Sequence, residues 1–91
     1  MELKEHFKGY FDLTQDEKEM KLSEVLDLYI LEMHTNLKTI DDITVEIKKI
    51  IEMSEMNDDF EITQAFKDLL DLIISIQQLF SKHKIENKKG G

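Results

Sequence analysis

Glycine and proline are almost missing from this chain, and their scarcity is its most informative feature. Proline does not occur, and no glycine lies between Tyr10 and Lys89. These two residues mark most turns and loops, and an all-β or α/β domain of this size would need several of them. The sequence therefore favours long α-helices joined by short polar turns.

Cysteine and arginine are absent as well, and each absence removes a class of function. Without cysteine, the chain has no disulfide, no thiolate ligand for zinc and no cysteine nucleophile. The 12 basic residues are all lysine, whereas arginine is the preferred residue for bidentate contacts to phosphates and bases. Together with the net charge of −8, this argues against direct nucleic-acid binding. A codon bias toward A and T would explain the same lysine usage.

Length and composition fit a single soluble domain in the cytoplasm. Of the 91 residues, 41% are hydrophobic and 35% are charged, which is too apolar a mixture for a disordered chain. The longest apolar-rich run, residues 69–80, is too short and too polar for the roughly 20 residues of a membrane span. No apolar segment follows the N-terminus, so we expect no secretory signal. The expected organisation is one helical domain over residues 1–84 and a disordered, lysine-rich tail over residues 85–91.

The spacing of apolar residues predicts three helices. A short N-terminal helix over about residues 2–12 is followed by a capping box, Thr14 with Glu17, that begins a long central helix. Three polar residues at 57–59 form a turn, and a third helix runs from about residue 58 to 84. The two long helices are expected to pair as an antiparallel hairpin. The predicted core of the third helix is Phe66, Leu69, Ile73 and Ile76.

Asn36 interrupts the apolar seam of the central helix, and two interpretations compete there. The seam residues around it are Leu22, Leu26, Tyr29, Met33, Ile40, Ile43, Ile47 and Ile50. Because this pattern keeps its phase across Asn36, we favour one continuous helix from about residue 15 to 56. The alternative is a helix that ends near Asn36 and restarts at Thr39, with Asp42 as its capping partner. That alternative would produce a four-helix bundle.

The third helix is apolar on nearly every side, which one antiparallel helix cannot cover. We therefore predict a partner-binding surface from its remaining apolar residues and from the N-terminal aromatic residues. These are Leu70, Leu72, Ile74, Leu79, Phe7, Tyr10 and Phe11. The expected partner is another protein or a second copy, and a homodimer would complete a four-helix-type bundle. The alternative is that the N-terminal aromatic residues cover the helix within one copy.

Residues suited to catalysis or to metal binding form no recognisable pattern. No Glu-x-x-His pair of the kind used by di-iron bundles occurs. His34 stands seven residues from both Asp27 and Asp41, a spacing that is more typical of a solvated helix face than of a metal site. No serine lies in a glycine-flanked turn, and no glycine-rich phosphate loop exists. We expect no catalytic, cofactor-binding or metal-binding residues, and therefore no enzyme.

These observations favour a small, acidic, helical interaction module that binds a partner protein or itself, like a chaperone, an inhibitor or a regulator. No group of residues resembles the motif of a known family. The 20 acidic residues also permit an inhibitor whose surface mimics nucleic acid, as in some phage-encoded proteins. A ligand- or metal-dependent protein is the least favoured alternative.

Overall fold

The computed structural model describes the backbone of residues 2–90 and the side chains of residues 2–79. In chain order, its elements are α1 (Leu3–His6), a 3-10 turn η1 (Tyr10–Asp12), α2 (Gln15–Asn36), α3 (Ile40–Met56) and α4 (Phe60–Gly90). No strand occurs among the described residues. The predicted all-α class is confirmed, with three long helices in place of the two expected.

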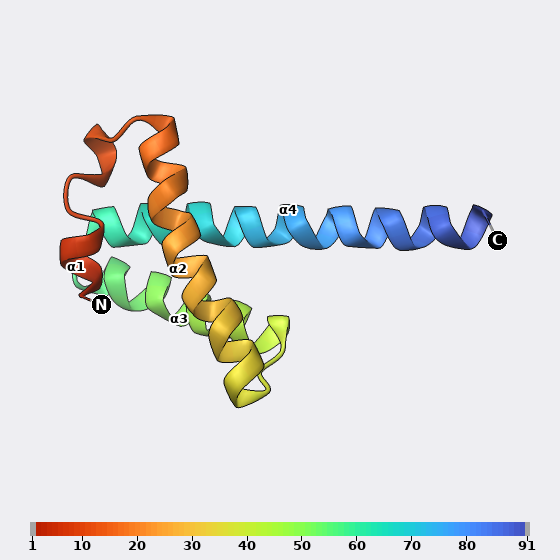
Figure 1. Cartoon of the computed structure of the whole chain (residues 1–91). Coiled ribbons are helices and arrows are strands. Elements are labelled where there is room, and N and C mark those ends of the chain that lie inside the picture. Colours follow the sequence, from red (N-terminus) through yellow and green to blue (C-terminus); the bar gives the residue numbers. More distant parts are fainter. Residues whose placement is uncertain (1, 91) are drawn as a thin grey trace.

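Figure 1 shows how the helices are arranged. Helix α3 and the first half of α4 form an antiparallel hairpin, closed by the predicted turn at residues 57–59. Helix α2 crosses this hairpin, and α1 with η1 covers the end near the turn. The second half of α4 extends away from the other helices, which accounts for the overall dimensions of 50 × 30 × 22 Å.

The continuous central helix that we favoured is wrong, because the chain breaks between Asn36 and Ile40. Leu37 adopts the left-handed conformation (φ 54°) that ends α2, and its side chain is 88% exposed. Thr39 then caps α3. Its hydroxyl accepts a hydrogen bond from the Asp42 N–H at 3.2 Å, and the Asp42 carboxylate accepts one from the Thr39 N–H at 3.0 Å. This capping box satisfies the first amides of a new helix, so the alternative interpretation of the sequence is the observed one.

The apolar phase across Asn36 did not reveal the break because α2 and α3 each bury their own face. Ile43 and Ile47 of α3 are buried, and so are Leu22 and Val25 of α2. Each helix keeps a 3.6-residue repeat whether or not the two are continuous. The pattern therefore reports which face is apolar and says nothing of the angle between the helices.

The N-terminal segment is anchored by aromatic side chains. Phe7 and Tyr10 are fully buried, and the Phe7 ring makes edge contacts with Tyr10 and Phe66 at 5.7 Å between centroids. The Tyr10 hydroxyl donates to Asp68 at 2.6 Å, and the Tyr10 N–H donates to Glu61 at 3.0 Å. Gly9 permits this path because its φ of 72° lies in the left-handed region that disfavours side chains. The predicted helix over 2–12 is therefore two short turns around Gly9.

The core runs along α4 and confirms most of the predicted core residues. Phe66, Leu69 and Ile73 are buried, while Ile76 is half-buried. A pair of hydroxyls lies inside the α3–α4 hairpin, where Ser54 and Thr63 are 2.6 Å apart and both are buried. Each hydroxyl has one proton, so one of them donates to the other, and the second donates to a main-chain carbonyl, that of Ile51 for Ser54 or that of Asp59 for Thr63.

The backbone of α4 stays helical to Gly90, beyond the end that we predicted near Lys84. No partner helix lies beside this extension in Figure 1. A lone helical segment of this length is only marginally stable in water. The domain boundary at residue 84 and the disorder of residues 85–91 stay predictions, and Gly91 lies outside the described residues.

Candidate functional site

An apolar groove lies where α2 diverges from the α3–α4 hairpin. Its cavity has a volume of about 190 Å³ and is lined by side chains of all three long helices. The lining residues are Leu26, Tyr29, Ile30, Met33, Ile40, Ile43, Ile73 and Ile76. Apart from Tyr29, whose ring is aromatic and carries a hydroxyl, every lining side chain is aliphatic or a thioether. We call this feature the groove below.

The groove is open because its walls are only partly covered by the rest of the chain. Ile73 and Ile43 form its buried floor, whereas Ile30 is 39% exposed and Ile40 is 37% exposed. Protein interiors rarely leave apolar voids larger than a water molecule. A hydrocarbon-lined space of this size at the surface is therefore suited to receiving apolar groups.

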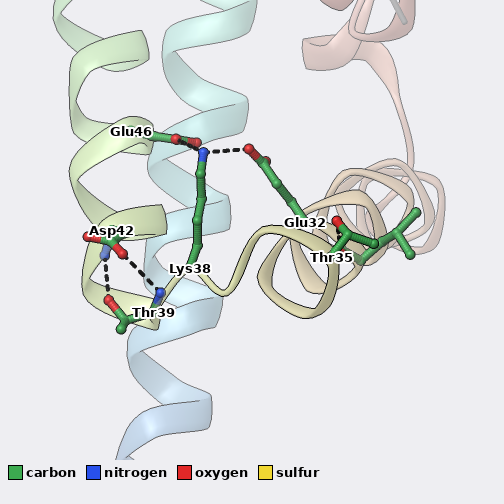
Figure 2. A network of polar contacts seen from close by, with 7 residues as sticks. Glu32, Thr35, Lys38, Thr39, Asp42 and Glu46 are labelled. Carbon is green, nitrogen blue, oxygen red and sulfur yellow. Dashed lines mark hydrogen bonds and ion pairs between the residues drawn. The ribbon is translucent and has the colours of Figure 1, made fainter.

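The corner between α2 and α3 is held by Lys38, as Figure 2 shows. Its ammonium group bridges the carboxylates of Glu32 on α2 and Glu46 on α3. Hydrogen bonds from Lys38 to these two carboxylates raise its pKa. The same two acids lie near Tyr29, and burial together with their negative charge raises the pKa of Tyr29 to about 12. These ion pairs connect α2 and α3 at the corner beside the groove.

The helical segments that form the groove are acidic. Residues 26–43 and 73–76, which include every lining residue, contain four acidic residues and one lysine, a net charge of −3. That lysine is Lys38, which is already bound by two carboxylates. The field around the groove therefore favours cationic groups on whatever approaches it.

The structure separates the predicted partner-binding residues into two groups. Phe7 and Tyr10 are buried in the core of a single copy. They cover part of α4 within the chain, as the alternative interpretation of the sequence expected. Leu70 and Leu72 are half-buried, with Leu72 in a shallow hollow beside Tyr10. The exposed members of the set are Phe11 (54%), Ile74 (42%) and Leu79 (63%).

The exposed members do not form one surface. Phe11 lines a hollow with Phe60 and Ile62 at the start of α4. Ile74 and Leu79 lie further along α4, in the part that contains the groove residues Ile73 and Ile76 and just beyond it. The single surface expected from the sequence is thus divided between the two ends of the molecule.

Sequence reasoning missed the groove even though it identified most of its residues. The sequence pattern places Tyr29, Met33 and Ile40 in the apolar seam of the central helix, where a hairpin would cover them. The capping pair Thr39 and Asp42 was the one signal that could have shown that the seam opens. A break at that point lets α2 diverge, so the seam residues become walls of a groove.

Other candidate residues lie outside any cluster. His34 is exposed on α2, and the described residues contain no group of three or more histidine or acidic side chains arranged to hold a metal ion. Ser54 is buried against Thr63. None of the helices searched within the described residues is long and apolar enough to cross a membrane.

Comparison with protein-family models, with curated proteins and with solved structures finds no match to this chain. The proposals below therefore rest on the geometry and chemistry of the chain itself.

Proposed function

We propose that this protein is an interaction module that binds the apolar face of a partner helix in the groove, as a chaperone, an inhibitor or a regulator would. The observation that supports this most strongly is the groove itself, an aliphatic cavity of about 190 Å³ that the described part of the chain leaves uncovered. Helix-in-groove binding uses apolar anchors spaced three or four residues apart on the incoming helix.

The charge around the groove selects the kind of helix. An apolar face flanked by lysine or arginine would place its anchors in the cavity and its cations beside the acids of α2 and α3. Electrostatic complementarity of this kind raises association rates and excludes acidic competitors. The preferred partner is therefore a basic amphipathic helix.

A model peptide tests this proposal directly. We expect an amphipathic helical peptide of leucine and lysine to bind the full chain, as measured by fluorescence anisotropy at nanomolar protein concentration. Ile30→Glu places a carboxylate on the groove wall and should weaken binding by at least about tenfold, the cost of desolvating a charge. The matched control is Leu28→Glu, because Leu28 lies on the same helix, is similarly exposed and does not line the groove.

Two results would contradict the proposal. Equal affinity of the Ile30→Glu and Leu28→Glu variants would show that the groove is not the site. Equal affinity for a peptide of the same composition with scrambled order would show that attraction between charges alone explains the binding.

A further inference from the structure

Two parts of the chain, residues 1–81 and residues 82–91, carry net charges of opposite sign. Residues 1–81 carry 19 acids and 8 lysines, whereas residues 82–91 carry 4 lysines and a single acid, Glu86. The net charges are −11 and +3. The basic part coincides with the extension of α4 that leaves the bundle in Figure 1. The acidic part contains the groove.

The composition of the basic segment also matches the interior of the groove. Phe80 and Ile85 supply large apolar side chains immediately before and among the four lysines. Apolar cavities of roughly 150 Å³ take up a molecule the size of benzene, so a cavity of about 190 Å³ has room for an aromatic side chain. We infer that the groove of one copy receives the lysine-rich segment, residues 80–90, of a second copy. This inference rests on the proposed function and names the partner.

The geometry of α4 favours a second copy over the segment's own groove. Phe80 follows Ile76 by one helical turn, but Lys82 to Lys89 lie six to thirteen residues beyond Ile76, so a continuous helix places the lysines about 9–20 Å past the groove at 1.5 Å per residue. Ile85 and the lysines reach their own groove only if α4 breaks and folds back, and the helix is continuous through this region.

A twofold axis makes the exchange reciprocal. Ile73 and Ile76 form the α4 wall of the groove. When two α4 helices pair antiparallel beyond these residues, each extension lies beside the Ile73 and Ile76 of the other copy. One contact then serves both chains, as twofold dimers require.

A charge exchange between two full-length variants tests the inference, with sedimentation velocity as the measurement. The tail variant carries Lys84→Glu and Lys88→Glu. The groove variant carries Asp27→Lys and Asp41→Lys, two exposed acids whose replacement leaves the Lys38 corner intact. We expect wild type to dimerise, each variant alone to dimerise at least about tenfold more weakly, and an equimolar mixture to recover the wild-type affinity.

The matched control is Lys48→Glu with Lys49→Glu, which changes the net charge as much as the tail variant does and leaves the groove and the segment untouched. It should dimerise like wild type. The inference is overturned if wild type stays monomeric at high micromolar concentration, if the tail variant dimerises like wild type, or if the control weakens dimerisation equally. Circular dichroism of each variant confirms that it is folded. Peptide binding by a monomeric wild type would refute this inference and leave the proposed function standing.

Discussion

The two ends of the bundle differ in how completely their side chains are covered. At the closed end, formed by α1, η1 and the start of α4, the rings of Phe7, Tyr10 and Phe66 pack edge to face and are fully buried. Polar groups there bond to one another across long sequence separations, as Tyr10 does with Asp68. This end holds the fold together.

The open end is formed by the second half of α2, the first half of α3 and the groove, and several of its apolar side chains are exposed, among them Ile30 and Ile40. The two helices meet through the exposed Leu37 and the ion pairs of Lys38. Their apolar side chains line a cavity and do not pack fully against one another. A small chain that is stabilised at one end can leave the other end free for binding.

The largest contrast is expected from truncation of the core. Phe66→Ala removes a fully buried ring that contacts Phe7 and should lower the free energy of unfolding by about 3–5 kcal/mol. Ile76→Ala, on the wall of the groove, should cost only about 1–2 kcal/mol because Ile76 is half-buried. Urea denaturation measures both, and equal losses would remove the distinction between the ends.

A smaller effect is expected at the hydrogen bond of the closed end. Tyr10→Phe leaves the Asp68 oxygen without this donor and should cost about 1–2 kcal/mol at neutral pH. Burial, then Asp68, raises the pKa of Tyr10 above its ordinary value of 10.0. The proton is therefore held more firmly in the folded state, so this contribution is present below pH 10 and is lost as the pH rises above it. The difference between variant and wild type should shrink on that alkaline side, and a constant difference would contradict the assignment.

Helices α2 and α3 each begin with a capping box, so the two boxes form a matched pair. Thr14→Ala and Thr39→Ala should each cost about 1 kcal/mol, because each removes the acceptor for an N-terminal amide. Only Thr39→Ala should also weaken binding of the model peptide, because Thr39 sets the start of α3 beside the groove. Equal peptide affinity in the two variants would show that the Thr39 cap does not influence binding in the groove.

The smallest effect on stability is expected at Ile74. This residue is 42% exposed, so Ile74→Glu should change the free energy of unfolding by less than about 1 kcal/mol. It should also leave dimerisation unchanged, because Ile74 does not line the groove. Light scattering distinguishes this outcome from the surface predicted from the sequence, for which Ile74→Glu would produce a monomer.

Local features were predictable from the sequence, since they depend on neighbouring residues. The Thr14–Glu17 capping box, the turn at 57–59 and the buried positions of Phe66, Leu69 and Ile73 all follow from spacing and side-chain chemistry. The break after Asn36 was visible only as an alternative, because phase alone cannot show it.

Features that depend on how distant segments meet were not predictable. The bond from Tyr10 to Asp68 joins residues 58 positions apart, and nothing local marks either one as a partner. The groove depends on the angle between α2 and the hairpin, and the ion pairs of Lys38 with Glu32 and Glu46 join residues from both sides of the break. Apolar residues at helical spacing look the same in a sequence whether they fill a core or line a cavity.

Methyl NMR of the isoleucine side chains during titration with the leucine–lysine peptide tests the central claim most directly. The account predicts that the methyl signals of Ile40, Ile43, Ile73 and Ile76 shift in the groove, while that of Ile62, at the closed end, stays in place. Shifts at Ile62 with unchanged groove signals, or no shifts at saturating peptide, would contradict the claim that the open end is the binding surface.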